Sequence, residues 1–540
     1  MKPKILVIGL DAATMDLVTP WAGMGYLPTL ARLLREGAHS TFRSTPNMHS
    51  ASAWTSILTG LNPGRHGLFV FSDRDFATGR QLFFKGGDRT GQLITSHLAR
   101  HNLTSGLLNV PMTYPAQCAP GGYVISGLDA PALNESAFCP KELRGELLNR
   151  FPAYNFTPPG LGDLMSAGRV DEAASAWLRL TEIQAAAAEY LLESHPVDFF
   201  MTVFTASDWA GHNLWTHFEC GDDEAISGEL MAVYRALDGA IARLLSHADE
   251  RTQVYVISDH GMGPHTQASY HLATWLEDNG FMFRKAGAER WASLIAGGRR
   301  AARSLLPLAL REKIKARFGA ERMQRIQAIE KDGFYSSIEW SRTLAYAEPG
   351  RHVININLEG RNGAGIVPST DYDLVCSRLS QGLSAWTDPK GVPAVAGVVR
   401  RDEAYAGPFT ERASDLYVQW NSEARFGDPP AEVQARGFWW SGDHRPAGVL
   451  ICRGPGIRNA ALLNAPVVYD LVPTIMYLAG LPVPADLDGR VIEELCEDDF
   501  RASHSVQRDS AEDPVNTEQA GLSDSEAQLV EEKLRSLGYL

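Results

Sequence analysis

Short apolar runs alternate with longer helical patterns along most of the chain. Residues 4–10, 199–205 and 252–258 have the apolar, β-branched character of buried strands, whereas 26–36 and 171–192 have helical spacing. This alternation predicts an α/β fold built on a doubly wound, mainly parallel sheet. Ligands of such sheets bind beyond the carboxyl ends of the strands. The side chains that follow these runs are therefore the first candidates for a functional site.

Length, charge and cysteine usage limit the class of protein. A chain of 540 residues is too long for one small core, so we expect a large α/β core with an insertion, or two domains. The net charge of −14 argues against a nucleic-acid polymer as partner. The absence of an apolar run of about 18 residues predicts no transmembrane segment. Six cysteines without a CxxC pair predict reduced thiols in a cytoplasmic protein.

A basic stretch interrupts the α/β pattern. Residues 283–331 carry thirteen Lys and Arg against four Glu, interleaved with apolar residues, which predicts amphipathic helices. These helices are either the solvated face of a lid or a contact for an anionic substrate or a membrane surface. The domains that we expect are a catalytic core over 1–264 and 431–496, with an inserted lid or cap region over 265–430.

The end of the chain has a different composition. Residues 497–524 are polar and acidic, which predicts a flexible linker. Ser523 and Glu526 then have the spacing of a capping box and predict a C-terminal helix over 525–540. The apolar residues of this helix are expected to dock on the core: Leu529, Val530, Leu534 and Leu537.

Acidic residues and histidines follow several of the predicted strands. Taken singly, an Asp after a strand is most often a helix cap, and a lone His is most often a structural residue. Together at one sheet edge, three carboxylates and three imidazoles are costly to place unless a cation neutralises them. A mixed Asp and His set suits zinc, with manganese or iron as competitors. The candidate ligands are Asp11, Asp208, His212, Asp259, His260 and His444.

A serine precedes one of the predicted helices. Ser50 follows a polar loop and lies at the start of a helical pattern over 51–58. Free backbone N–H groups at a helix N-terminus favour a phosphoryl oxygen, so Ser50 is a candidate nucleophile. The alternative is that Ser50 is a plain helix cap.

These segments resemble the alkaline phosphatase superfamily, in particular its type I phosphodiesterase/nucleotide pyrophosphatase branch. The motifs that carry the resemblance are GLDAA, SASAWTSILTGLNPGRHGLF, SDWAGH, ISDHGMG, GDHRPAG and DLVPTIMYLAGLPVPADLDGR. The stretch from IEWSRTLAYA to ASDLYVQW also resembles a group of bacterial phosphohydrolases of this superfamily. The order and approximate spacing of the motifs agree over most of residues 1–495. The resemblance implies an alkaline phosphatase-like α/β fold with an inserted lid or cap.

The resemblance also implies a site that holds two divalent metal ions. One ion would be bound by Asp208, His212 and His444, and the other by Asp11, Asp259, His260 and the nucleophile. The nucleophile of this branch aligns with Ser50, where many relatives have Thr. A proline that is common two residues later is replaced by Ser52, which is therefore a rival nucleophile. SASAW lacks the Pro and the Arg of the sulfatase motif, so a formylglycine sulfatase is not expected.

The expected function is a metal-dependent phosphohydrolase. It would cleave phosphodiester or pyrophosphate bonds of a small, nucleotide-like or other phosphorylated substrate through a covalent phosphoseryl intermediate on Ser50. A phosphomonoesterase or a phosphotransferase that uses the same two metal ions is the alternative. A binding protein that uses the metal only for stability is a third reading, which the presence of Ser50 and all six ligands weakens.

Overall fold

A computed structural model places most of the chain. It describes residues 2–75, 81–220, 224–286, 334–361, 365–430, 440–462, 464–510 and 521–537. The predicted basic helices of 283–331 lie almost entirely outside the described residues.

An eight-stranded sheet forms the centre of the molecule, with the strand order β2-β16-β9-β1-β8-β5-β6-β7. The parallel pairs are β1–β8, β1–β9, β5–β8 and β5–β6. β16 is antiparallel to both of its neighbours, and β7 is antiparallel to β6. The prediction of a doubly wound, mainly parallel sheet is confirmed. The strands are β1 (Ile5–Leu10), β2 (Ala38–Arg43), β5 (Ser105–Val110), β6 (Tyr123–Ser126), β7 (Phe138–Cys139), β8 (Phe199–Phe204), β9 (Gln253–Ile257) and β16 (Ala447–Arg453).

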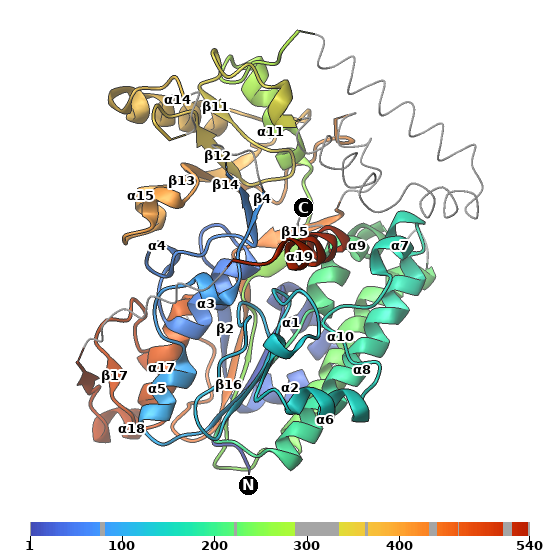
Figure 1. Cartoon of the computed structure of the whole chain (residues 1–540), viewed down its shortest axis with the longest axis vertical. Helices are drawn as coiled ribbons and strands as arrows, with labels where there is room; N and C mark the ends of the chain where they lie inside the picture. The colour runs from blue at the N-terminus through green and yellow to red at the C-terminus, as the bar shows by residue number, and fades with distance from the viewer. Residues whose placement is uncertain are drawn as a thin grey trace.

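Helices cover both faces of this sheet (Figure 1). Successive side chains of a strand point to opposite faces, so Leu6 and Ile8 of β1 join one apolar cluster while Ile5 and Val7 join the other. The first cluster packs under α1 (Met15–Gly23), α2 (Pro28–Glu36), α8 (Val170–Ser194), α9 (Ala206–Cys220) and α10 (Glu224–Leu245). The second packs under α3 (Ser50–Thr59), α5 (Ile94–Arg100) and α17 (Leu471–Leu478). Both faces of the sheet are therefore buried.

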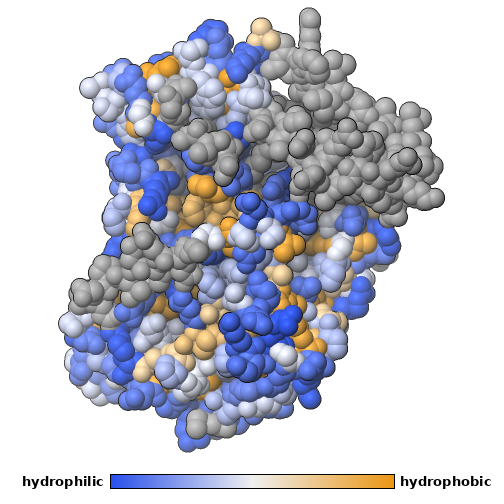
Figure 2. Space-filling model, viewed as in Figure 1, coloured by the Kyte–Doolittle hydropathy of each residue, from blue (hydrophilic) through white to orange (hydrophobic). Residues whose placement is uncertain are grey.

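A second, smaller sheet forms a cap above the carboxyl end of the main sheet (Figure 1). Its antiparallel strand order is β11-β12-β14-β13. The cap has its own apolar cluster with α11 and α14. Hydrophobic residues are visible between the cap and the core in the space-filling view (Figure 2). The cap elements are β11 (Ala345–Tyr346), β12 (Val353–Ile356), β13 (Val395–Arg400), β14 (Leu416–Trp420), α11 (Ala268–Asp278) and α14 (Tyr372–Ser384).

A two-stranded ribbon joins the chain on either side of the cap. β10 (Gly261–Pro264) leads into the cap and β15 (Gly442–Arg445) leads out of it, and the two strands pair antiparallel. Met262 lies opposite His444 in this pairing. After the cap, β15 therefore brings the chain back to the end of β9. The chain left this place more than 170 residues earlier in the sequence.

The prediction that all cysteines are reduced thiols is wrong. Cys118 and Cys139 form a disulfide between the loop after β5 and the edge strand β7. Among the described residues, Cys376, Cys452 and Cys496 are free and buried. A pairing over 21 residues has no CxxC signature, so spacing gave no warning of it. Location in the cytoplasm stays a prediction. No helix in the described part of the chain has the length and apolar character needed to cross a membrane.

The segment predicted to be a linker contains regular structure at its start. α18 (Asp498–Ser503) lies there, and β18 (Arg508–Asp509) pairs with β17 (Val483–Pro484). Residues 511–520 of the predicted linker lie outside the described part. Short helices and strands on the surface can be as polar as a linker, so composition alone does not distinguish the two.

The C-terminal helix α19 (Asp524–Ser536) begins at the predicted capping box, in which Ser523 Oγ accepts from the Glu526 amide. Val530 and Leu534 are buried against the core, as expected. Leu529, however, is 44% exposed, so its predicted docking is wrong. Residues 530 and 534 are one helical turn apart and share a face, whereas 529 points about 100° away from that face.

We expect Leu534→Ala to destabilise the docking of α19 by about 2–5 kcal/mol, because the change leaves a cavity at a buried site. Leu529→Ala is the matched control and should alter stability by less than about 0.5 kcal/mol. Hydrogen exchange of the α19 amides measures both effects. Equal protection of α19 in the two variants would contradict the docking seen here.

Candidate active site

Three of the predicted ligands meet where β1 and β9 end. Asp11 follows β1, while Asp259 and His260 follow β9. The two strands are parallel neighbours, with Gly9 opposite Ile257, so the residues after them lie at one edge of the sheet. Each of the three side chains offers one ligand atom, and these atoms all lie within 4.8 Å of one another. All three residues are buried.

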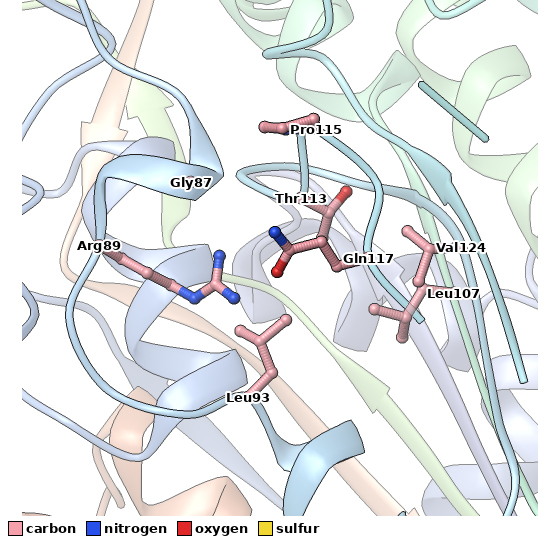
Figure 3. Close-up of a pocket in the computed structure, with 8 residues that line it drawn as sticks. All are labelled: Gly87, Arg89, Leu93, Leu107, Thr113, Pro115, Gln117 and Val124. Carbon is pink, nitrogen blue, oxygen red and sulfur yellow. The ribbon is translucent and has the colours of Figure 1, made fainter. Parts of the chain in front are cut away.

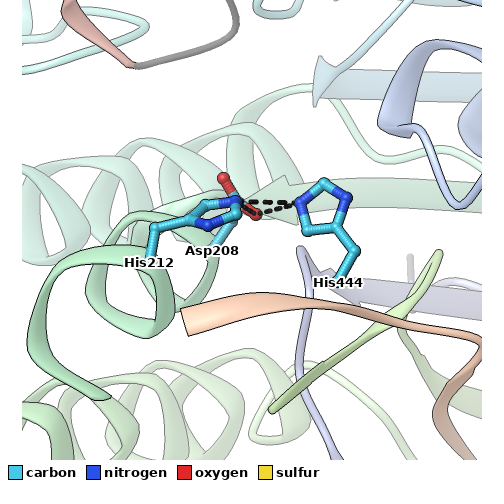
Figure 4. Close-up of side chains that lie close together, drawn as sticks. All are labelled: Asp208, His212 and His444. Atoms are coloured by element: carbon cyan, nitrogen blue, oxygen red, sulfur yellow. Dashed lines mark hydrogen bonds and ion pairs between the residues drawn. The ribbon is translucent and has the colours of Figure 1, made fainter. Parts of the chain in front are cut away.

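The other three predicted ligands form a second cluster beside the first. Asp208 and His212 lie one turn apart on α9, which follows β8, and His444 comes from β15. Asp208 Oδ1 is 3.3 Å from the Nε2 atoms of both histidines. Figure 4 shows the three side chains converging. Their ligand atoms again lie within 4.8 Å of one another.

The ribbon between core and cap brings the two clusters together. β10 begins at the residue after His260. It pairs with β15, which contains His444, so His444 lies close to His260. The imidazole rings of His260 and His444 have centroids 3.8 Å apart. The structure thus unites in one site all six residues that the sequence selected as ligands.

Ser50 lies against the first cluster. Its Oγ is 3.1 Å from His260 Nε2 and 3.4 Å from Asp11 Oδ1. Ser50 is the first residue of α3, and α3 packs closely on β1 because Gly9 has no side chain. A Cβ at Gly9 would lie 2.5 Å from the Trp54 ring. This close approach is what sets Ser50 beside Asp11.

The rival serine has a different environment. Ser52 Oγ donates to the Asn47 Oδ1 at 2.7 Å and lies 2.9 Å from the His49 carbonyl oxygen. Thr45 Oγ1 is also 2.9 Å away. These contacts tie Ser52 into the loop before α3, and the structure places Ser50 rather than Ser52 against the ligand clusters.

The protonation pattern of the histidines fits a bound cation. His212 Nδ1 lies 2.9 Å from the Gly442 carbonyl oxygen, and His444 Nδ1 lies 2.7 Å from that of Met48. A carbonyl only accepts, so both Nδ1 atoms carry a proton, and neutral rings then have lone pairs on Nε2. The two Nε2 atoms face each other at 2.9 Å. Two lone pairs or two N–H groups repel at that distance, whereas a cation between them binds both.

The buried carboxylates also indicate a bound cation. Among the described residues, Asp11 Oδ2 and Asp259 Oδ2 accept no hydrogen bond, although both atoms are buried. A buried carboxylate oxygen without a donor is costly unless a cation takes that place. The donor set of each cluster therefore fits a divalent metal ion, with the imidazole and carboxylate ligands that zinc prefers.

Burial and mutual repulsion shift the titration of these groups. Burial, followed by the charge of Asp259, raises the pKa of Asp11 well above its ordinary value. Burial raises the pKa of Asp259 to about 7. Burial also lowers the pKa of His260 and so favours the neutral imidazole that binds metal.

Sequence reasoning missed three residues that surround the ligands. Asp443 is buried, and its Oδ1 accepts from the His444 amide at 2.9 Å. The same Oδ1 lies 2.9 Å from Nε2 of His352, which belongs to the cap. Trp440 stacks on His212 with ring centroids 3.7 Å apart. Asp443 directly precedes His444 in GDHRPAG, so this motif contains a signal for it, whereas no motif indicates His352 or Trp440.

Similarity to known proteins agrees with this geometry. The family described as "Type I phosphodiesterase / nucleotide pyrophosphatase" matches residues 5–442. The chain belongs to this family. It is therefore a phosphoesterase, and the fold and motifs are those of the alkaline phosphatase superfamily. His444 lies two residues beyond the matched range and is placed in the site by the structure.

Solved structures of similar fold include human and murine ectonucleotide pyrophosphatase/phosphodiesterase 5. Each is 12% identical, with 92% of this chain and 100% of the other covered, at TM-scores of 0.49 and 0.48. The murine protein is also known as an inactive variant in complex with AMP, with 12% identity, the same coverage and a TM-score of 0.49. No curated protein matches the chain in sequence.

A small cavity lies elsewhere in this phosphoesterase. Its volume of about 10 Å³ holds about one water molecule. The polar ends of Arg89 and Gln117 point toward each other there (Figure 3). None of the predicted site residues lines this cavity, and it is too small for a phosphorylated substrate.

We expect Asp259→Asn to lower the metal content of the protein while stabilising the metal-free form. In the wild type the raised pKa means that the folded state holds the Asp259 proton more tightly than the unfolded state, so stability falls as pH rises from about 4 to about 7. Asparagine carries no charge at any of these pH values. The stabilisation should therefore be larger at pH 8 than at pH 5.

Metal analysis of the purified protein and urea unfolding in the presence of a chelator measure the two effects. Asp278→Asn, which alters an exposed carboxylate at the end of α11, is the control and should change neither. Full metal content in Asp259→Asn would show that Asp259 is not a metal ligand.

Proposed function

We propose that the chain hydrolyses phosphodiester or pyrophosphate bonds through a covalent phosphoseryl intermediate on Ser50. The observation that carries the proposal is the position of Ser50 Oγ, 3.1 Å from His260 Nε2 and 3.4 Å from Asp11 Oδ1, at the first residue of α3. This position puts a hydroxyl among groups that fit a cation. Ser50 also begins α3, where the Ala51 amide donates to His49 Nδ1 at 3.2 Å, and the positive end of the helix dipole favours a phosphoryl oxygen.

Two metal ions are part of this proposal, with zinc as the first choice and manganese or iron as competitors. Asp208, His212 and His444 would hold one ion, and Asp11, Asp259, His260 and Ser50 the other. When bound, such ions lower the pKa of a ligand hydroxyl and stabilise negative charge on phosphoryl and leaving oxygens. The Gly442 and Met48 carbonyls would keep the proton on Nδ1 of His212 and His444, so that Nε2 stays available as a ligand.

The chemistry of the chain follows from these positions. Ser50 loses its proton to solvent, and its Oγ attacks phosphorus as the bond from phosphorus to the leaving oxygen breaks. The leaving group takes up a proton from water. A water molecule then attacks the phosphorus in line with the Oγ–P bond and gives up a proton to solvent. The Oγ–P bond breaks, Oγ takes up a proton, and the second product is released from the restored Ser50. Two displacements of this kind need no Ser-His-Asp triad.

The substrate that this site supports is a small phosphorylated molecule, nucleotide-like or carrying another organic group. A phosphomonoesterase or phosphotransferase would use the same residues, and the choice between these reactions depends on what surrounds the second substituent of phosphorus. Cytoplasmic location remains part of the proposal and rests on the sequence alone.

We expect Ser50→Ala to keep its metal content but to lose turnover by several orders of magnitude, because the nucleophile is removed while the six carboxylate and imidazole ligands stay. Mass spectrometry of acid-quenched wild type should find phosphate, or the substrate's phosphoryl ester, on the peptide that contains residue 50. Ser52→Ala is the matched control two residues away and should retain the adduct. An adduct that survives in Ser50→Ala and disappears in Ser52→Ala would reverse the assignment.

A hydrolysis panel tests the reaction class. With zinc or manganese present, we expect bis-p-nitrophenyl phosphate and a nucleotide sugar to be cleaved faster than p-nitrophenyl phosphate. A chelator should abolish all activity, and added metal should restore it, because six ligands converge on the site. Faster cleavage of the monoester would favour the phosphomonoesterase, and release of less free phosphate than p-nitrophenol in the presence of an alcohol would favour transfer.

A further inference from the structure

Three consecutive residues at the entry to β15 all contact the predicted ligand His212. The Trp440 indole stacks on the His212 imidazole, with ring centroids 3.7 Å apart and an angle of 24° between the planes. The Ser441 amide donates to the His212 carbonyl oxygen at 2.8 Å. The Gly442 carbonyl oxygen lies 2.9 Å from His212 Nδ1. The ring face, one ring nitrogen and the backbone of this ligand are therefore each held by a different residue of one short segment.

Two glycines allow this segment to approach α9 closely. A Cβ at Gly442 would lie 2.1 Å from the Gly211 carbonyl oxygen, and a Cβ at Gly211 would lie 2.5 Å from Met262 Cγ. A side chain at either position would push β15 and β10 away from the helix that carries His212. The close backbone approach thus brings the Trp440 ring into contact with the imidazole.

The cap fixes the backbone of Trp440. The Trp440 amide donates to Tyr270 Oη at 3.1 Å, and the Trp440 carbonyl oxygen accepts from Gln267 Nε2 at 3.4 Å. Tyr270 lies in the first turn of α11, is buried, and stacks on His265 with ring centroids 4.7 Å apart. The ring that covers His212 is therefore anchored in the cap, whereas His212 itself belongs to the core.

Stacking of this kind favours the metal-bound state of His212. When Nε2 binds a divalent ion, the imidazole takes on part of the positive charge, and the electron-rich face of an indole attracts such a ring more strongly than a neutral one. Trp440 also occupies space into which the imidazole would rotate, so less conformational entropy is lost when the metal binds. Both effects raise the affinity for the metal although Trp440 is not itself a ligand.

We propose that Trp440 is a positioning residue, which fixes the His212 imidazole in its metal-binding orientation and is itself held by Tyr270 of the cap. The inference deepens the proposed function and rests on its two-ion site. Its effect is confined to the ion that Asp208, His212 and His444 would hold. The cap is thereby connected to that ion by a ring contact, in addition to the ribbon of β10 and β15.

Zinc titration of the metal-free protein against a chelating dye tests the proposal, because it measures the dissociation constants of the two ions. Trp440→Leu should raise one constant by about 10- to 100-fold, the range for residues that orient a metal ligand, and should change the other by less than about twofold. Trp440→Phe keeps a flat ring and should restore the constant to within about threefold of the wild type. Tyr270→Phe removes only the oxygen that accepts from the Trp440 amide and should raise the same constant by about two- to fivefold.

Two further variants assign the effect to one ion and separate it from stability. Asp259→Asn impairs the other ligand cluster, so the loss caused by Trp440→Leu should persist in that background. Trp386→Leu is the matched control, because Trp386 is a half-buried tryptophan in the apolar cluster of the cap. It should lower the stability of the metal-free protein to urea, as Trp440→Leu does, but should leave both dissociation constants unchanged.

The possible outcomes distinguish this inference from the proposed function. An unchanged zinc affinity in Trp440→Leu, an equal loss for both ions, or no recovery in Trp440→Phe would overturn the role of Trp440 and leave the two-ion site in place. If Trp440→Leu does not fold, an unchanged constant in Tyr270→Phe overturns the inference in the same way. A wild type that binds no zinc, manganese or iron would overturn the proposed function together with the inference.

Discussion

Three carboxylates buried at one edge of a sheet are the constraint on which the site depends. Asp11, Asp208 and Asp259 are each 5% exposed or less. Strands β9, β1 and β8 are neighbours in the sheet and run in the same direction, so the residues that follow them meet. Buried like charges repel and lose hydration, and this cost is offset only by positive charge at the same place. Three imidazoles and Ser50 converge on the same edge, and with the carboxylates they form a ligand set for cations that would supply this charge.

Much of this arrangement could be predicted from the sequence because it depends on strand ends. An apolar run followed directly by Asp11, or by Asp259 and His260, fixes both the strand and the place of the ligands. Asp208 and His212 are four residues apart, which puts them on one face of a helix whatever the rest of the fold. His444 comes just before a strand instead of after one, so its local signal is weaker. Pairing of β10 with β15 supplies the physical reason for its position.

Other features depend on contacts that local patterns do not encode. The apolar run at 448–452 is typical of a buried strand, but an apolar run carries no information on strand direction, and β16 is antiparallel. The edge strand β2 was not predicted, because a polar residue, Ser40, takes one of its three buried positions, which weakens the apolar alternation. The Cys118–Cys139 disulfide and the contact between His352 and Asp443 both join segments that meet only in the folded chain.

The position of β16 sets an order of events during synthesis. Among the described strands of the main sheet, β2 pairs only with β16, which begins at residue 447, whereas β2 ends at residue 43. At about 5–20 residues per second, the ribosome needs roughly 20–80 s to make the intervening chain. Throughout that interval β2 and the open side of β9 are unpaired strand edges, which attract other chains. The main sheet is therefore complete only after the cap has been made, and the newly made chain exposes two strand edges until then.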